Sequence, residues 1–155
     1  MNNTSSSRFT QLKHFLLKHE GLILFLSFLL LLRIPNLFEP YWYGDEAIYL
    51  PIGTGLRHGL RLYSEIIDHK TPLIYFLAMA PSQFWFRMLL ICWMLVSTVL
   101  FFSITKALKF RIRSQYLSTL LFVLFTSLPW LEGNIPNGEL FVIGFILAGA
   151  WIFTH

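Results

Sequence analysis

The chain has 155 residues, of which 55% are hydrophobic and only 13% are charged, and its formal net charge is +4. Soluble domains usually carry about a quarter charged residues, so this composition argues against a soluble nucleic-acid-binding protein, a disordered tail or a small disulfide scaffold. The single cysteine, Cys92, lies inside an apolar run and allows no disulfide framework or cysteine metal cluster. The composition is typical of a polytopic membrane protein.

The first apolar segment, residues 21–32, carries no charge. At ~1.5 Å per residue it covers only about 18 Å of the ~30 Å hydrocarbon core, so it must borrow neighbouring residues. We therefore predict a span over 15–34, with Arg33 near one end, where it can snorkel. A signal peptide is the alternative, but Arg33-Ile34-Pro35 stands where a small-residue cleavage site is expected. We interpret the segment as a retained anchor.

Positive charge orients the later segments. The segment 106–113 has four basic residues and no acid, and the N-terminal tail is also basic. By the positive-inside rule both lie in the cytoplasm, so an even number of crossings separates them. The short apolar stretch Pro72–Pro81 is therefore not a span, but lies on the outer surface or dips in and returns.

The predicted fold class is all-α, a polytopic transmembrane helical protein with about four spans and membrane-lying helices in the first outer loop. The predicted order is a cytoplasmic tail (1–14), a first span (15–34), an outer loop (35–84), a second span (85–105), a cytoplasmic loop (106–114), a third span (115–131), a second outer loop (132–138) and the start of a fourth span (139–155). The fourth segment supplies only about 14 apolar residues, or ~21 Å. We expect an N-terminal fragment of a longer protein, inactive alone.

The first outer loop contains two predicted helices. Gly44-Asp45 opens a helical pattern in which Asp45 and Tyr49 share a face, and Pro51 is expected to kink or shorten it. An N-cap at Thr71 followed by Pro72 opens the second, short helix. Taken singly, the polar residues of this loop have simple interpretations: a helix N-cap for Asp45, a snorkelling interfacial lysine for Lys70 and a solvated surface histidine for His69. The aromatic residues 41–43 are expected to form a belt at headgroup level.

Three stretches of this loop together are more specific. They are Tyr43-Gly44-Asp45-Glu46-Ala47-Ile48-Tyr49, Gly59-Leu60-Arg61-Leu62-Tyr63 and Asp68-His69-Lys70-Thr71-Pro72-Leu73-Ile74-Tyr75. In order and spacing the loop resembles the first outer loop of the C-type (GT-C) membrane glycosyltransferases, in the branch of protein mannosyltransferases, aminoarabinose transferases and related bacterial family 39 enzymes. The resemblance implies transfer of a hexose or pentose from a polyprenyl-phosphate-sugar donor to an envelope lipid, glycan or protein acceptor. It also implies a bacterial inner membrane, with the active loop outside the cytoplasm.

The resemblance assigns roles as well. Asp45 takes the place of the family's catalytic aspartate, acting as a base or through a metal, and Glu46 is its companion. A carboxylate at the membrane edge can accept the proton of an acceptor hydroxyl. Lys70 matches the lysine that holds the donor phosphate, with Arg33 and Arg57 as weaker candidates.

The chain departs from the family pattern at two positions. The family usually shows Lys-Pro-Pro where this chain has Lys70-Thr71-Pro72, and His69 stands where many relatives carry an acid. His69 with Asp68 or Glu139 could bind a divalent metal ion, which is the one cofactor that we consider.

The second outer loop supplies another acid. Its simple interpretation is a turn rich in Pro, Gly and Asn, with Asn137 capping the next helix. In the family that the chain resembles, an acidic residue stands at the start of the fourth span, and Glu139 fits that place better than Glu132. A carboxylate at the membrane edge is costly unless it is used or solvated.

Two other functions remain open. A non-catalytic subunit that binds or flips a lipid carrier would use the same loop without chemistry. A transporter or channel predicts charged residues in mid-span, yet 88–104 and 116–131 contain none. No nucleic-acid partner is expected; the expected partners are the lipid donor, the envelope acceptor and membrane lipids.

Overall fold

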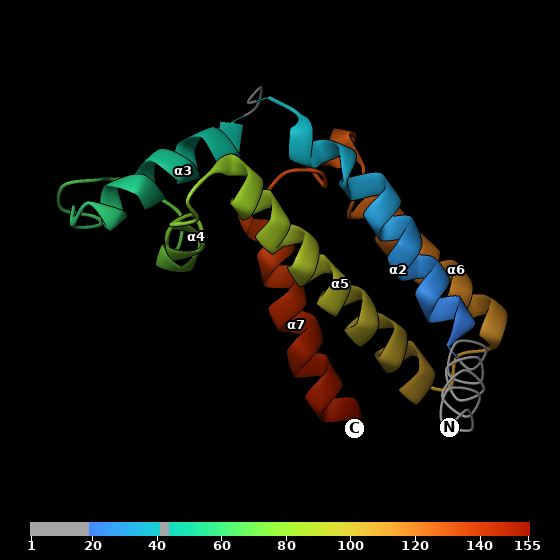
Figure 1. Ribbon diagram of the computed structural model, residues 1–155. Helices are drawn as coiled ribbons and strands as arrows, with labels where there is room; N and C mark the ends of the chain where they lie inside the picture. The colour runs from blue at the N-terminus through green and yellow to red at the C-terminus, as the bar shows by residue number, and fades with distance from the viewer. Residues whose placement is uncertain (1–18, 41–43) are drawn as a thin grey trace, which may run out of the picture.

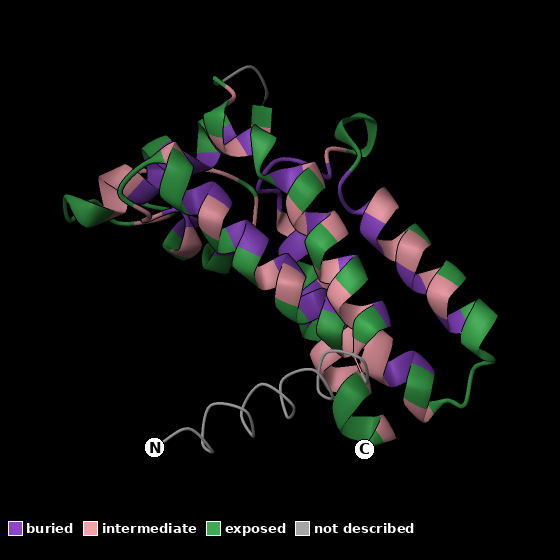
Figure 2. Ribbon diagram, turned by 45° about the vertical axis from the view of Figure 1, so that its right-hand side comes forward, coloured by how far each residue is buried: buried purple, intermediate pink, exposed green. Residues whose placement is uncertain are grey.

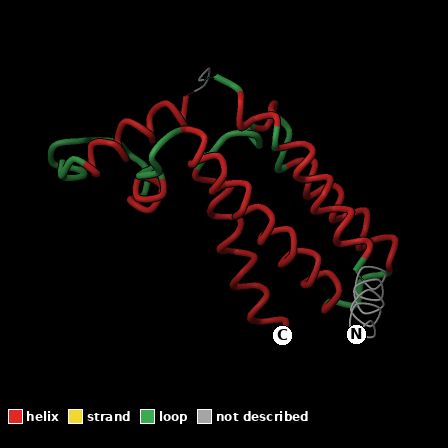
Figure 3. The backbone as a smooth tube through the Cα atoms, viewed as in Figure 1, coloured by secondary structure: helices red, strands yellow, loops and turns green. Residues whose placement is uncertain are grey.

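The computed structural model describes residues 19–40 and 44–155 (Figure 1). The predicted cytoplasmic tail, the start of the predicted first span and the aromatic belt at 41–43 lie outside these residues. The elements are α2 (Glu20–Arg33), η1 (Pro35–Phe38), α3 (Gly44–Arg57), α4 (Pro72–Leu77), α5 (Gln83–Ala107), α6 (Ile112–Phe125), η2 (Pro129–Leu131) and α7 (Gly138–Thr154). Helices make up 72% of the described residues and these contain no strand (Figure 3), so the predicted all-α class is confirmed.

The helices α2, α5, α6 and α7 form a bundle in which successive long helices run in opposite directions (Figure 1). The central helix, α5, packs against the other three. Its 25 residues follow from a long apolar run without Gly or Pro, and Leu90 and Met94 lie on its buried face. Buried residues face the interior, whereas exposed ones lie on the outward faces (Figure 2). These outward faces carry large apolar side chains, among them Leu24, Leu31 and Ile146.

Among the described residues, two segments are long and apolar enough to cross a membrane. They are Glu20–Phe38, with 19 residues and a mean hydropathy of 2.1, and Gln83–Ala107, with 25 residues and a mean hydropathy of 2.3. α6 and α7 are shorter apolar helices. α6 ends at Phe125, six residues before the predicted end of the third span. Pro129 disfavours the helical conformation at the preceding residue, and Leu128 is extended, with ψ at 128°.

Close contacts between α5 and α7 hold the start of α7 in place. A Cβ atom on Gly144 would lie 2.4 Å from the Trp93 side chain, so only glycine allows this approach. The indole Nε1 of Trp93 donates a hydrogen bond to the carbonyl of Phe141 at 3.1 Å. The rings of Phe86 and Phe141 stack with centroids 6.2 Å apart. These contacts fix the helix turn that carries Glu139.

α3 and α4 project from one end of the bundle, beside η1 and η2 (Figures 1 and 3). They pack together where Gly53 meets the backbone of Ala78, and the rings of Tyr49 and Tyr75 meet edge to face at 5.8 Å. Pro51 lies inside α3 without ending it. Thr71 takes the N-cap position of α4 as predicted, although its side chain makes no capping hydrogen bond.

Candidate functional site

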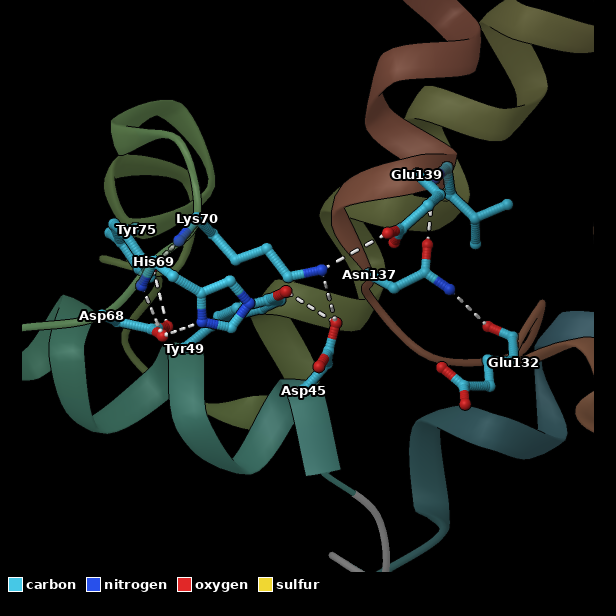
Figure 4. Close-up of polar contacts among 10 residues, drawn as sticks. Asp45, Tyr49, Asp68, His69, Lys70, Tyr75, Glu132, Asn137 and Glu139 are labelled. Atoms are coloured by element: carbon cyan, nitrogen blue, oxygen red, sulfur yellow. Dashed lines mark hydrogen bonds and ion pairs between the residues drawn. The ribbon is translucent and has the colours of Figure 1, made fainter.

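Three of the sequence-predicted residues meet at the junction of α3, the loop before α4 and the start of α7 (Figure 4). The Nζ atom of Lys70 lies 3.3 Å from Oε1 of Glu139 and 3.8 Å from Oδ2 of Asp45. Lys70 and Asp45 are partly shielded, whereas Glu139 is exposed. The hydrogen bond to Glu139 raises the pKa of Lys70, so the ammonium group stays charged. We call Asp45, Lys70 and Glu139 the acid–lysine cluster.

Asp45 is oriented by its own helix. It lies in the first turn of α3, which begins at Gly44, and it therefore does not occupy the N-cap position. Tyr49, four residues later on the same face, donates a hydrogen bond from its hydroxyl to Oδ2 of Asp45 at 2.6 Å. Burial raises the pKa of Tyr49, and the bond to Asp45 raises it further. Tyr49 therefore remains a donor, and no described residue hydrogen-bonds to Oδ1 of Asp45.

Two tyrosines hold the backbone of Lys70. The hydroxyl of Tyr75 accepts a hydrogen bond from the Lys70 backbone N–H at 3.1 Å and donates one to Oδ2 of Asp68 at 2.7 Å. The hydroxyl of Tyr63 donates to the Lys70 carbonyl at 2.6 Å. The side chain of Lys70 is thereby aimed at the two carboxylates from a backbone fixed on both sides. Both tyrosines belong to the quoted motifs, but sequence reasoning gave neither a role.

Asp68 and His69 pair with each other rather than with the acid–lysine cluster. Oδ1 of Asp68 accepts a hydrogen bond from the His69 backbone N–H at 2.7 Å and lies 2.9 Å from His69 Nδ1. Within the described part of the chain, no group of three or more His, Cys, Asp or Glu side chains could hold a metal ion. The two residues therefore do not fit a metal site of their own, because a protein-held ion usually takes more ligands.

A cavity of about 490 Å³ lies beside the cluster, between α4 and α7. His69, Lys70, Thr71 and Glu139 provide its polar lining. The remainder is almost entirely apolar, with Leu73, Ile74 and Leu77 from α4 and Phe141, Val142, Ile143 and Phe145 from α7. A cavity with one charged region and a long apolar wall suits an amphiphile with a polar head.

Glu46 is not brought to the cluster. Its side chain is 2% exposed and pairs with Arg87 of α5, which is also 2% exposed. Arg87 donates from Nε to Oε1 at 2.8 Å and from Nη2 to Oε2 at 2.7 Å, and Gln83 donates to Oε2 at 3.0 Å. Both carboxylate oxygens of Glu46 are therefore occupied. Glu46 was expected to be a companion of the catalytic aspartate, but in the structure it forms a buried ion pair with Arg87. Sequence reasoning missed Arg87, whose only signal was a charge near the start of an apolar helix.

The two weaker phosphate candidates also lie elsewhere. Arg33 is 1% exposed and its guanidinium donates to the carbonyl of Thr126, so it ties α2 to the end of α6 and does not snorkel. Arg57 lies at the opposite end of α3 from Asp45, where it is exposed and donates to Oγ1 of Thr54 at 3.1 Å. Neither arginine lines the cavity.

The loop between α6 and α7 places its two acids differently. Asn137 caps α7 as predicted, because its side chain accepts a hydrogen bond from the Leu140 N–H at 2.9 Å. Its Nδ2 donates to the Glu132 carbonyl at 2.9 Å (Figure 4), and Glu132 has a left-handed backbone with φ at 55°. The Asn137 cap sets the first turn of α7, so that Glu139, rather than Glu132, reaches Lys70.

No protein-family model matches the chain, and no curated protein or solved structure matches it either. The functional interpretation therefore depends on the motif residues and on their geometry.

Proposed function

We propose that the chain is part of a membrane glycosyltransferase that moves a sugar from a polyprenyl-phosphate-sugar donor to an envelope lipid, glycan or protein acceptor outside the cytoplasm. The observation that carries this proposal is the acid–lysine cluster, of which Lys70 and Glu139 line the polar end of an apolar cavity and Asp45 lies beside Lys70. In this proposal α2, α5, α6 and α7 cross a bacterial inner membrane, and α3 and α4 lie at its outer surface.

The cavity supports a lipid-phosphate donor. Leu73 and Phe141 represent the apolar wall that an isoprenoid chain would contact, and Lys70 supplies the positive charge that a phosphate leaving group requires. A lysine suits this role as a flexible point charge with three donors. When a phosphate binds, the ammonium group exchanges its contact with Glu139 for contacts with phosphate oxygens.

Asp45 supports the transfer step. In the proposed step an acceptor oxygen attacks the anomeric carbon and its proton passes to the Asp45 carboxylate. The bond between the anomeric carbon and the phosphate oxygen breaks, and polyprenyl phosphate leaves with its charge balanced by Lys70. Tyr49 holds Oδ2 of Asp45 at 2.6 Å, so the carboxylate is oriented while Oδ1 faces no described hydrogen-bond donor.

The proposed orientation has two supports. The basic connection between α5 and α6 lies at the opposite end of the bundle from α3 and α4, beside the start of α2 and the end of α7 (Figure 1). The outward faces of the bundle are rich in apolar side chains that water would not favour. The basic connection agrees with a cytoplasmic N-terminus and an extracytoplasmic site, and the apolar faces agree with placement of the bundle in a membrane.

The decisive experiment substitutes Asp45→Asn in membranes containing the complete gene product. Radiolabelled sugar is supplied on a panel of undecaprenyl-phosphate sugars and counted in the lipid, glycan and protein fractions. General-base catalysis typically contributes about 10²–10⁴-fold, so transfer should fall at least about 100-fold while membrane insertion is unchanged. Glu65→Gln, at an exposed carboxylate of the same loop, is the matched control. Transfer near wild type in Asp45→Asn would contradict the catalytic assignment.

Lys70→Ala tests the donor site separately. Removal of the ammonium group should raise the donor concentration needed for half-maximal transfer. An unchanged dependence on donor concentration would count against the assignment of Lys70 to the donor phosphate.

A second candidate is a non-catalytic subunit that binds or flips a lipid carrier. The cavity and Lys70 favour it, since they would bind a lipid phosphate without any chemistry. This candidate predicts that Lys70→Ala weakens binding of undecaprenyl phosphate, whereas Asp45→Asn changes no transfer reaction.

A further inference from the structure

Arg87 joins three segments around the site through a single guanidinium group. Nε and Nη2 bind the two carboxylate oxygens of Glu46, and Nη1 donates to the backbone carbonyls of Asn36 and, at 2.7 Å, Glu39. The two carbonyls precede Asp45 in the chain, and Glu46 follows it directly. Arg87 therefore binds backbone carbonyls of a segment that precedes the proposed base and the side chain of the residue that directly follows it.

Stability alone does not account for this arrangement. Removing two charges from water is costly, and apolar residues of similar volume are often as stabilising as a buried ion pair. The fork of an arginine on a carboxylate does provide fixed direction, through two parallel charge-assisted hydrogen bonds. What the Arg87–Glu46 pair provides, and an apolar pair of the same volume would not, is a fixed relative direction of the two side chains.

The pair also connects the two sides of the acid–lysine cluster. Arg87 lies on α5 next to Phe86, whose ring stacks on Phe141 of α7. Phe141 lies two residues after Glu139, so α5 and α7 carry Glu139 as one packed unit. The pair attaches α3, and with it Asp45, to the same unit.

We infer that Arg87 and Glu46 are positioning residues, which hold Asp45 at a fixed place relative to Lys70 and Glu139. The catalytic consequence rests on the proposed function, whereas the geometric one does not. Neither Arg87 nor Glu46 lines the cavity, so the pair acts on the rate of transfer and not on donor binding.

The geometric claim is tested by double electron–electron resonance on the chain in lipid nanodiscs. Spin labels are attached at Ile48→Cys on α3 and Ile146→Cys on α7, both exposed, with Cys92→Ser as background. A narrow distance distribution is expected without further change. Arg87→Gln should broaden or shift it, whereas the control Arg61→Gln, at an exposed arginine, should not. An unchanged distribution in Arg87→Gln would overturn the inference, whatever the activity.

A second variant covers the case in which Arg87→Gln fails to fold because Glu46 is left buried and unpaired. Arg87→Met combined with Glu46→Leu removes both charges and keeps an apolar volume, so it should fold with a melting temperature close to that of the wild type. It should nevertheless show the broadened distance distribution. A folded double variant with the wild-type distribution would contradict a positioning role.

Kinetics on the complete gene product then separate this role from a purely structural one. A displacement of the base by about 1 Å can cost about 100-fold in rate. We expect kcat to fall about 10–100-fold in the double variant, with the KM for the undecaprenyl-phosphate sugar unchanged within about threefold. A raised KM with unchanged kcat would overturn the positioning role. If the variants change the spin-label distances but the wild type transfers no sugar, the geometric inference is supported. Only the proposed function is then contradicted.

Discussion

The hydroxyl group of Tyr75 makes two hydrogen bonds to the loop that precedes α4. It is fully buried, it donates to Asp68 and it accepts from the backbone N–H of Lys70. Burial raises its pKa, and the hydrogen bond to Asp68 raises it further, so it remains a donor at all ordinary pH values. Tyr75→Phe should lower the free energy of unfolding by about 1–3 kcal/mol, because buried polar partners are left unsatisfied.

This change can be measured by chemical unfolding in detergent micelles, followed by circular dichroism. Tyr116→Phe is the matched control, because the Tyr116 hydroxyl makes no hydrogen bond to a described residue and its ring packs beside Gly21. Equal losses in the two variants would mean that the Tyr75 hydroxyl has no special part in holding the loop.

Asp68 should make the stability of the folded chain depend on pH in the acid range. Burial alone would raise its pKa, but the hydrogen bonds from the Tyr75 hydroxyl and the His69 backbone N–H outweigh burial and leave the pKa below its ordinary value of 3.8. The folded state therefore gains stability from the ionised carboxylate above that value. This gain is lost as the pH falls through the lower pKa of the folded state.

Asp68→Asn should therefore lower the melting temperature at neutral pH and flatten its decline at acid pH. The measurement is a thermal scan from about pH 3 to about pH 7, in which the curves of variant and wild type should converge at the acid end. Glu65→Gln, at an exposed position of the same loop, is the control. Parallel curves for Asp68→Asn and wild type would contradict the inferred stabilisation.

Three residues that the sequence singled out for the site do lie together in the structure. The residue next to one of them, Glu46, does not join them. Asp45, Lys70 and Glu139 were selected from motifs 25 and 69 residues apart, and the structure places their charged groups together. The family resemblance makes Glu46 a companion of Asp45, the residue directly before it. Adjacent residues on a helix point about 100° apart, so Glu46 faces α5 while Asp45 faces the loop. Only the contacts of Glu46 with Gln83 and Arg87 of α5 reveal that difference.

At the level of elements, the contact between α3 and α4 depends on Gly53. An added Cβ would lie 2.2 Å from the carbonyl oxygen of Ala78, which is backbone and cannot rotate away. Gly53→Ala should therefore push α4 from α3 and cost about 1–3 kcal/mol of stability, the usual range for overpacking. Transfer should also fall, since α4 follows directly on Lys70.

The control for this prediction is Gly149→Ala, where an added Cβ meets nothing within 4 Å. That change should leave stability unchanged or raise it slightly, because alanine favours the helix more than glycine does. Melting temperatures of both variants in the same detergent provide the comparison. A Gly53→Ala chain as stable as Gly149→Ala would show that α3 and α4 can separate at no cost.

Helix existence was predictable, but helix ends were not. The N-cap and proline signals predicted the starts of α4 and α7, and the apolar run 85–105 predicted nearly all of α5. α6 instead starts at Ile112 and ends at Phe125, because hydrophobicity alone continues past the point where Pro129 ends the helix. Arg33 donates to the carbonyl of Thr126 at the end of α6, and Asn137 donates to the carbonyl of Glu132 after η2; no residue pattern reveals either contact.

For the whole molecule, the positions of the basic residues in the sequence agree with the arrangement of the helices in the bundle. The positive-inside rule considers only the basic residues of the sequence, whereas the helix arrangement contains no membrane, so the two observations are independent. Both separate the same two ends, with the basic connection 106–113 at one and the acid–lysine cluster at the other (Figure 1). The agreement supports two outer loops and one inner loop. The lengths of α6 and α7, with 14 and 17 residues, are less informative, because each covers under about 30 Å.

Cysteine labelling tests this orientation directly. In a Cys92→Ser background, Ser64→Cys places an exposed thiol in the loop between α3 and α4, and Ser114→Cys places one near the start of α6. A membrane-impermeant maleimide should label Ser64→Cys in intact cells, but should label Ser114→Cys only after permeabilisation, because basic segments are retained on the cytoplasmic side. Labelling of Ser114→Cys in intact cells would reverse or remove the proposed crossing between the two positions. If Ser64→Cys were protected from the maleimide at the same time, the acid–lysine cluster would lie on a side where an extracytoplasmic acceptor could not reach Asp45.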